Sequence, residues 1–331
     1  MRNVGRKDSI AGSSDADPGL AQTMANLRFP LLDGLKDTLS PGQRLLSLAI
    51  GLFLAVCSGW AAATPPSLPV EVSILPQKLF VTMIGGDRVS VSVLVPPGYE
   101  PADYSPSPSQ MHALATARIY FAIGVPFEDA WLPKIRAINP RLEIVPTQDG
   151  IQKMPMDTGG RISPGKPRLL DPHIWLSPSL VRIQGMNIRD ALIRADPQHA
   201  AIYRLNYLRF ARYVNSVDEK ILSILAAHRR RTRTFMVFHP AWGYFARDYG
   251  LRQLPIEIEG KDPAPRDLVR LIHEAKRLGI KTVFVEPQFS KHAATAIATA
   301  IGGQVVAVDP LAENWGANLV AATEALLSGS R

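Results

Sequence analysis

The amino-acid sequence predicts an α/β protein with two lobes, each containing a parallel sheet flanked by helices, linked by one long backbone helix. Three observations support this fold class. Short β-branched segments alternate with helical segments in the first half of the chain, and the alternation returns in the second half. Between the halves, about thirty residues repeat apolar side chains every three or four positions. Alternation of strand and helix is typical of parallel sheets with helices on both faces.

The first lobe is expected over residues 64–195. Its predicted strands are short, rich in β-branched residues and bounded by Pro or Gly, and they lie at residues 70–75, 89–95, 119–122 and 142–145. Its predicted helices lie between these strands, at residues 76–84, 109–116 and 128–138. Residues 149–172 contain Gly and Pro without a clear period, so a loop is expected there.

One long helix is expected over residues 196–230. Asp196 provides an N-cap side chain, and Pro197 suits the first helical position. The apolar residues that step by three or four, and are expected to face the core, are Ile202, Leu205, Leu208, Ala211, Val214, Val217, Ile221 and Leu225. At 1.5 Å per residue such a helix is roughly 45 Å long, enough to brace both lobes.

The second lobe is expected over residues 231–331. Its predicted strands lie at residues 235–238, 282–285 and 304–308. Its predicted helices are each followed by a glycine and lie at residues 268–278 and 293–301.

Residues 1–63 are expected to be an extension plus a signal peptide. Residues 45–56 form an uninterrupted apolar run after Arg44, too short to span a bilayer and typical of a signal-peptide core. Small residues at 61–63 suit a cleavage site, so a periplasmic location is expected. A lipid anchor at Cys57 is the less favoured alternative, because Val56 is bulky where a lipoprotein box has a small residue.

The formal net charge is +8, but the basic residues are spread along the chain. One dense run, residues 228–233, lies where the long helix should end, and cations are favoured at helix C-termini. A partner or a membrane surface is the alternative reading of this run. The sequence has neither zinc-finger spacing nor an RNA-binding aromatic signature, so no nucleic-acid partner is expected. A single cysteine excludes a disulfide within the chain.

Polar side chains directly follow several predicted strands. They are found in the loop at residues 98–107 and at His239, Glu286 and Asp309, while His173 follows the long loop. Ligands of open α/β sheets bind at the carboxyl ends of strands, and imidazole with carboxylate oxygen suits zinc, manganese or iron. Each residue alone also fits a simpler role, as a hydrogen-bonded loop residue or a helix cap. The residues therefore support a metal-pocket hypothesis.

Several motifs occur in a fixed order along the chain: IGVPFE at residues 123–128, DPHIWLSP at 171–178, FHPAWGYF at 238–245, EPQFS at 286–290 and VDPL at 308–311. Together they resemble the metal-binding solute-binding proteins of zinc/manganese ABC importers, the ZnuA/TroA-like family. The resemblance covers essentially residues 70–331.

The resemblance implies that His173, His239 and Asp309 are metal ligands and that the cation is buried between the two lobes. It implies delivery of a divalent metal ion to an ABC permease and its ATPase rather than catalysis, so no enzyme activity is expected. A monomer is also expected. The histidine at position 239 favours zinc, because manganese members typically carry a carboxylate there; manganese is the alternative.

One departure concerns the family's first motif, usually PHxYxPxP with a histidine ligand. This chain reads PADYSPSP at residues 101–108, so Ala102 takes the ligand position and cannot coordinate. Glu100 and Asp103 are the candidate replacements, with water or His112 as further alternatives, although a structural role is favoured for His112. The alternative function is a family member with an altered site that binds manganese or iron, a metal chelate or a protein partner. A hydrolase with an open coordination position lacks a general base in this sequence.

Overall fold

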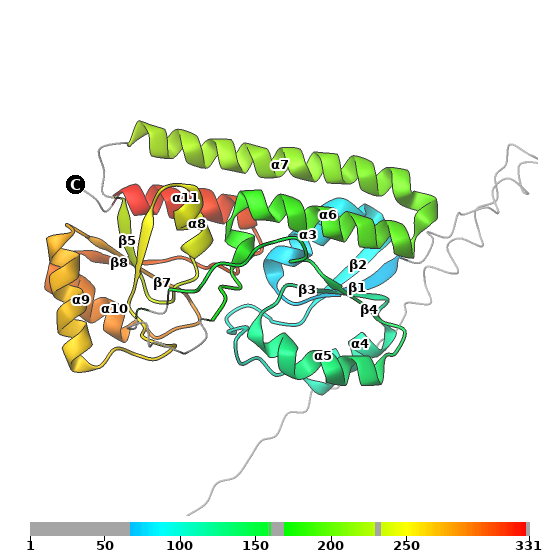
Figure 1. The fold of residues 1–331 in the computed structure, drawn as a ribbon, viewed down its shortest axis with the longest axis horizontal. Helices are drawn as coiled ribbons and strands as arrows, with labels where there is room; N and C mark the ends of the chain where they lie inside the picture. The colour runs from blue at the N-terminus through cyan, green and yellow to red at the C-terminus, as the bar shows by residue number, and fades with distance from the viewer. Residues whose placement is uncertain (1–66, 158, 160–168, 229–232, 329–331) are drawn as a thin grey trace, which may run out of the picture. The chain divides into compact units, whose positions relative to one another are not determined.

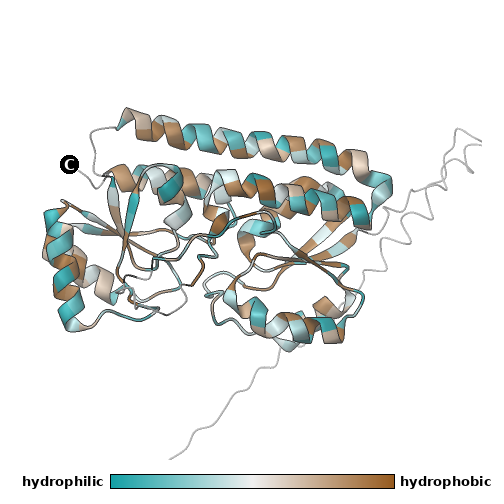
Figure 2. Cartoon of the chain, in the orientation of Figure 1, coloured by the Kyte–Doolittle hydropathy of each residue, from teal (hydrophilic) through white to brown (hydrophobic). Residues whose placement is uncertain are grey.

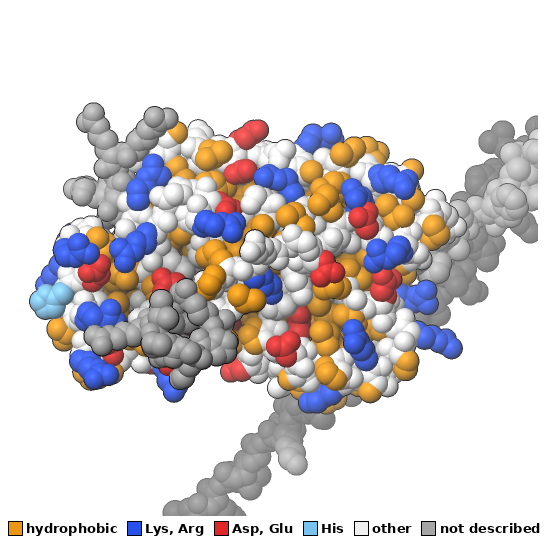
Figure 3. Space-filling model, viewed as in Figure 1, with side chains coloured by type: hydrophobic (Ala, Val, Ile, Leu, Met, Phe, Trp, Pro, Cys, Tyr) orange, Lys and Arg blue, Asp and Glu red, His pale blue; other side chains and the backbone are white. Residues whose placement is uncertain are grey.

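The computed structural model describes residues 67–157, 159, 169–228 and 233–328, which all belong to one compact unit, Pro65–Arg331. The expected export segment, including Cys57, lies outside the described residues, as does most of the basic run at 228–233. On the face shown in Figure 3, Lys and Arg side chains are scattered and interleaved with Asp and Glu. No helix in the described part of the chain is long and apolar enough to cross a membrane.

The first lobe contains a four-stranded parallel sheet in the order β2-β1-β3-β4. Its strands are β1 (Leu68–Val72), β2 (Val89–Val93), β3 (Ile119–Ala122) and β4 (Glu143–Pro146). The inner strand β3 is buried at every position, whereas the edge strand β2 exposes Ser90 and Ser92. A strand covered on both faces requires continuous apolar residues, which is why IYFA forms β3.

Helices cover both faces of this sheet (Figure 1). They are α3 (Leu75–Gly85), α4 (Pro108–Thr116), α5 (Pro126–Ile138) and α6 (Pro178–Ala195). Helix α3 packs against α6 on one face, and α4 packs against α5 on the other. Apolar residues line the strands and the inner sides of the helices, while the outer sides are more polar (Figure 2).

The second lobe repeats this topology in the strand order β6-β5-β7-β8, again all parallel. Its strands are β5 (Thr234–Val237), β6 (Arg252–Pro255), β7 (Thr282–Val285) and β8 (Gln304–Ala307). Its helices are α8 (Gly243–Asp248), α9 (Pro265–Arg277), α10 (His292–Ile301) and α11 (Trp315–Ser328). The predicted fold class, two parallel-sheet lobes with a long helix between them, is confirmed.

The long helix begins as a short 3-10 turn, Pro197–His199, and continues as α7 (Ala200–Ala227). Its 28 residues correspond to about 42 Å. Asp196 does not cap the helix by its side chain; instead its Oδ2 accepts hydrogen bonds from Tyr203 Oη (2.6 Å) and His199 Nδ1 (2.7 Å). Helix α7 packs on α3 and α6 of the first lobe and on α11 at the end of the second.

The predicted apolar stripe of α7 is wrong in its first half. Ile202, Leu205 and Leu208 are exposed by 39%, 48% and 54%, whereas Tyr203 and Phe210 are fully buried. The sequence offers two overlapping apolar stripes in this segment, and the one with the larger aromatic side chains faces the core, where it buries more apolar area. The second half of the prediction is correct, with Val214, Val217, Ile221 and Leu225 all buried.

The main hydrophobic core is continuous from the first lobe through α7 into α8 and α11. Phe80 of α3, for example, contacts Phe210 of α7 and Trp315 of α11 edge-on, each with ring centroids 5.5 Å apart. A second core lies between the second sheet and helices α9 and α10. The two lobes are therefore joined by packed side chains as well as by the chain itself.

The sequence-based prediction did not assign four elements: α6, α8, β6 and α11. Helix α8 has only six residues, too short for a helical period to be recognised, and β6 reads RQLP, without the β-branched residues that mark the predicted strands. Helix α6 carried ordinary start signals, because Ser177 is its N-cap and Pro178 its first residue.

Candidate metal centre

The candidate metal ligands lie where the sequence places them, beyond the carboxyl ends of strands. His239 follows β5 by two residues, and Asp309 follows β8 by two. His173 ends the long loop and precedes the short 3-10 turn Ile174–Leu176. His173 is buried and His239 is nearly so, with 13% of its side chain exposed.

The structure brings His173 and His239 together. Their Nε2 atoms face each other at 3.2 Å, although the residues are 66 positions apart. Two nitrogens bound to one tetrahedral zinc at about 2.0–2.1 Å would be separated by about 3.3–3.4 Å. The observed separation is therefore close to that of two ligands on one cation.

Each imidazole is held from behind by a carboxylate. Asp171 Oδ1 lies 2.7 Å from His173 Nδ1, and Glu257 Oε1 lies 3.0 Å from His239 Nδ1. A carboxylate at Nδ1 fixes the ring in the tautomer that carries its proton on Nδ1 and its lone pair on Nε2. Both rings therefore present lone pairs to the same point.

The backbone around Asp171 explains why the first pair is rigid. Asp171 Oδ1 also accepts the backbone N–H of His173 (2.9 Å), and the carbonyl of Asp171 accepts a hydrogen bond from Tyr244 Oη (2.9 Å). Its second oxygen, Oδ2, is buried without a hydrogen-bond partner among the described residues. Aromatic rings complete the setting, since His173 contacts Trp175 edge-on and His239 stacks on Phe289.

Further carboxylates surround His239. Glu286 Oε2 accepts the backbone N–H of His239 at 3.3 Å, while Glu286 Oε1 is buried with no partner in the described part of the chain. Burial raises the pKa of Glu286 to about 8, and the charges of Glu257 and Glu100 also raise it. Burial likewise raises the pKa of Glu100, while the nearby His239 lowers it. Carboxylates clustered in this way hold their protons more tightly than free ones, and a bound cation would stabilise their ionised forms.

Asp309 is not joined to the histidine pair in this geometry. Its Oδ1 accepts hydrogen bonds from Gln288 Nε2 (3.0 Å) and from the backbone N–H of Leu311 (2.9 Å). Within the described ranges, no group of three or more His, Cys, Asp or Glu side chains is arranged to hold a metal ion. The structure thus assembles two of the three predicted ligands, and the complete ligand set stays a prediction.

The loop between β2 and α4 carries the remaining candidates. Ala102 and Asp103 are exposed, and the backbone N–H of Ala102 donates to Glu100 Oε1 at 3.3 Å. His112 is exposed on α4. Of these residues, Glu100 is the one whose charge acts on both His239 and Glu257.

Sequence reasoning missed Glu257. The residue follows β6 at its carboxyl end, the same kind of position that pointed to His239 and Asp309. Because β6 itself was not predicted, Glu257 could not be recognised as a residue that follows the carboxyl end of a strand.

Two indole groups connect the loops that carry His173 and Asp309. Trp175 Nε1 donates to the carbonyl oxygen of Pro310 at 2.8 Å, and Trp315 Nε1 donates to that of Trp175 at 2.6 Å. Because Trp175 lies two residues after His173 and Pro310 directly follows Asp309, these bonds fix the position of one ligand loop relative to the other.

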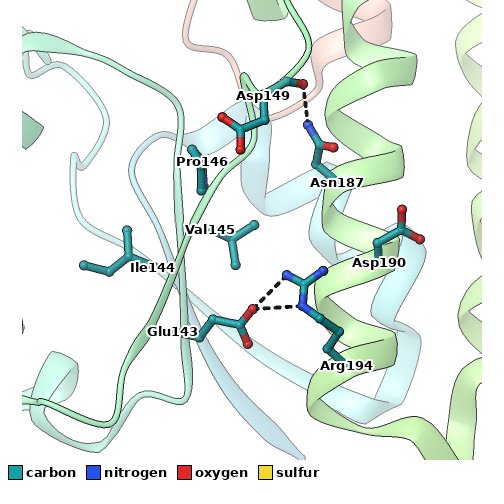
Figure 4. Close-up of a pocket in the computed structure, with 8 residues that line it drawn as sticks. All are labelled: Glu143, Ile144, Val145, Pro146, Asp149, Asn187, Asp190 and Arg194. Atoms are coloured by element: carbon teal, nitrogen blue, oxygen red, sulfur yellow. Dashed lines mark hydrogen bonds and ion pairs between the residues drawn. The ribbon is translucent and has the colours of Figure 1, made fainter.

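A polar pocket elsewhere in the first lobe lies between β4 and α6 (Figure 4). Arg194 Nη2 contacts Glu143 Oε1 at 2.8 Å, and Asn187 Nδ2 donates to the carbonyl oxygen of Asp149 at 2.9 Å. None of the residues that line it belongs to the histidine site. Within it Glu143 is paired with Arg194, while Asp190 is bonded to Arg189, which does not line the pocket.

Comparison with known proteins identifies a family of metal-uptake proteins and similar solved structures. Residues 70–326 match the family described as ZnuA, zinc-uptake complex component A, periplasmic. A crystal structure of a ZnuA deletion mutant with zinc bound is similar with a TM-score of 0.73 and 40% sequence identity, covering 80% of this chain and 98% of that one.

Two relatives bear the names of different metals. The high-affinity zinc uptake system protein ZnuA of Bacillus subtilis is 25% identical over 274 residues, 78% of this chain and 85% of the relative. The manganese-binding lipoprotein MntA of Halalkalibacterium halodurans is 29% identical over 221 residues, 66% of this chain and 71% of the relative.

Proposed function

The chain belongs to the ZnuA family of periplasmic zinc-uptake components, and from that premise we propose that it captures zinc outside the cytoplasm and delivers it to an ABC permease. The family consists of metal-binding components of ABC importers and not of enzymes. The metal is therefore the cargo of this protein, and binding rather than chemistry is what its site has to achieve.

The observation that carries the proposal is the contact between His173 Nε2 and His239 Nε2 at 3.2 Å. Two neutral imidazoles with lone pairs directed at each other repel, unless a proton or a cation lies between them. Because Asp171 and Glu257 occupy the two Nδ1 positions, the Nε2 atoms are the ones available to a metal. A divalent cation resolves the repulsion and also offsets the negative charge of the neighbouring carboxylates.

Asp309 is the proposed third ligand. Its Oδ1 is hydrogen-bonded to Gln288, a neutral side chain that a cation can displace. The bond from Trp175 to Pro310 holds the Asp309 loop against the loop of His173. Release from Gln288 would free the carboxylate of Asp309 to serve as the oxygen donor beside the two imidazole nitrogens.

Zinc is favoured over manganese by the donor atoms. Two imidazole nitrogens suit zinc, whereas manganese prefers carboxylate and carbonyl oxygen. The zinc-bound relative at 40% identity supports this choice. Manganese is the alternative cargo, since a manganese-binding relative is also similar.

The remaining parts of the proposal follow from the export segment. Residues 45–56 direct the chain to the periplasm as a signal peptide, where the monomer meets its permease, which is driven by an ATPase. The periplasmic description of the family and the lipoprotein name of one relative support an extracytoplasmic location.

Calorimetric titration of the demetallated protein tests the proposal. We expect one zinc per chain, and we expect His173→Ala and His239→Ala each to weaken binding by more than about 100-fold, beyond the loss typical of an outer-shell partner. His112→Ala is the matched control, because His112 is exposed on α4. Zinc affinity that is unchanged by both site substitutions would rule the proposal out. Binding that requires an added small chelator would instead support the alternative function, recognition of a metal chelate.

A further inference from the structure

Two imidazoles and Asp309 leave zinc one donor short of the four that it takes in closed sites. We propose that Glu100 supplies the missing donor, by leaving the backbone N–H of Ala102 and turning its carboxylate toward the Nε2 atoms of His173 and His239. This inference rests on the proposed function, because it names a further ligand of the same cation. It makes the loop between β2 and α4 the element that closes the site.

The position of Glu100 supports this role. Glu100 belongs to the first lobe, yet its charge interacts with those of His239 and Glu257 in the second. Its bond to Ala102 is 3.3 Å long, at the weak end of the range for N–H···O bonds. The carboxylate therefore lies beside Ala102, at the ligand position of the family's first motif, and it is weakly held there.

A second observation points independently to a positive ligand in the same place. Glu286 is only 1% exposed, and its Oε1 has no hydrogen-bond partner among the residues that the structure describes. The charges that act on Glu286 come from two more carboxylates, Glu257 and Glu100. Buried carboxylates are normally paired or bound to a metal, so this cluster fits a cation and does not fit an anionic or apolar ligand.

The other acidic residues near the site are less suited to the role. Glu257 is committed to His239 Nδ1, and Glu286 is bonded to the backbone N–H of His239. Asp103 is exposed and has a shorter side chain. Among these four residues, Glu100 combines a weak present bond, a position beside Ala102 and a charge that acts on His239.

The chemical consequence is a site with two nitrogen and two oxygen donors. Such a set still suits zinc, but its oxygen share makes it more tolerant of manganese and iron than a site with three imidazoles. A histidine at position 102 would replace one oxygen donor by nitrogen and should shift the preference back toward zinc.

Glu100→Gln, which keeps the size and removes the charge, is the test, with Asp87→Asn, an exposed acid of the same lobe, as the matched control. We expect Glu100→Gln to lower zinc affinity at least about tenfold in a competition titration and Asp87→Asn to leave it unchanged. The double variant Glu100→Gln/Ala102→His should recover the affinity, because the new imidazole replaces the lost donor. Cobalt substitution gives a second readout, since the visible absorption of bound cobalt depends on its ligands and should change in Glu100→Gln.

The outcomes separate this inference from the proposed function. Wild-type affinity and an unchanged cobalt spectrum in Glu100→Gln would overturn the role of Glu100, while a loss of binding in His173→Ala in the same experiment would leave the function standing. Unchanged binding in both His173→Ala and His239→Ala would overturn the function itself. Thermal unfolding in the presence of a chelator shows whether each variant is folded, and the rescue by Ala102→His distinguishes a lost ligand from a damaged loop.

Discussion

Trp315 and Trp175 are joined by a hydrogen bond of 2.6 Å, from the indole Nε1 of Trp315 to the backbone carbonyl oxygen of Trp175. Both side chains are almost completely buried. Trp315 begins the last helix of the second lobe, and Trp175 lies in the turn that follows His173. This bond therefore connects the two lobes directly at the candidate metal centre.

Replacing Trp315 by Phe should destabilise the metal-free protein. The change leaves the carbonyl oxygen of Trp175 buried without a donor, which costs about 1–3 kcal/mol in the free energy of unfolding. Urea unfolding in the presence of a chelator measures this value. Trp131→Phe is the control, because Trp131 lies partly exposed on α5. Equal unfolding midpoints for the two variants would show that the bond contributes nothing.

The carboxylates behind the two imidazoles should affect metal affinity without touching the metal. Asp171→Asn and Glu257→Gln each replace the charged acceptor of an Nδ1–H by a neutral amide oxygen, and a change of such a partner typically weakens metal binding by about 10–100-fold. Zinc titration checks this, with the exposed Glu259→Gln as a control close in sequence. If both site variants bind like the control, the anchoring carboxylates play no part in metal affinity.

Glu71 should make stability depend on pH in a region remote from the site. It is a buried residue of β1, and burial raises its pKa from 4.5 to about 7, while a hydrogen bond with Ser92 partly opposes this. Because the pKa in the folded state is the higher one, the folded state binds the proton more tightly. Its contribution to stability is therefore complete below pH 4.5 and is lost as the pH rises to about 7.

Glu71→Gln, which stays neutral, should remove this loss. The variant should gain stability relative to wild type across the window between the two pKa values, by up to about 1.4 kcal/mol per pH unit, and the difference should level off above it. Unfolding curves at a series of pH values measure the difference. A difference that does not change with pH would mean that Glu71 titrates in the folded protein as it does in the unfolded chain.

Replacing a side chain by alanine should reduce stability on the buried side of α7 and hardly change it on the exposed side. Phe210→Ala removes a fully buried ring that contacts Phe80, and such a change costs about 3–5 kcal/mol. Leu208→Ala changes a side chain that is 54% exposed, so the effect should stay within about 0.5 kcal/mol. Denaturant unfolding of both variants shows which stripe of this helix faces the core. Comparable losses in the free energy of unfolding would contradict the burial described above.

Much of the fold could be predicted from the sequence, because strand and helix periods are local properties. The strands at Ile119–Ala122 and Thr282–Val285 were predicted with their observed bounds. The helical period alone could not predict which face of α7 is buried near residue 205. Both Leu205 and Tyr203 fit a helical period, and only the packing against α3 and α6 selects between them.

In the candidate site, too, local sequence patterns located some residues and could not predict long-range contacts. His173 and His239 were found through motifs and through their places after a loop and a strand, and the structure brings them together. Glu257 was missed because its strand reads RQLP, which has no β-branched residue and only one aliphatic side chain besides Pro255. The orientation of Asp309 depends on a contact with Gln288 that no local pattern encodes.

Helix α7 is packed on α3 and α6 at one end and on α11 at the other, and the main core runs through all four helices. A helix that is packed at both ends resists bending, because bending would separate side chains from their neighbours. Large rotations of one lobe relative to the other therefore cost more free energy than the movement of a surface loop. The metal ion should accordingly enter and leave by movement of a loop while the two lobes stay in place. The speed of metal exchange should then be governed by loop kinetics, and stiffening that segment should slow uptake and release together while leaving their ratio nearly constant.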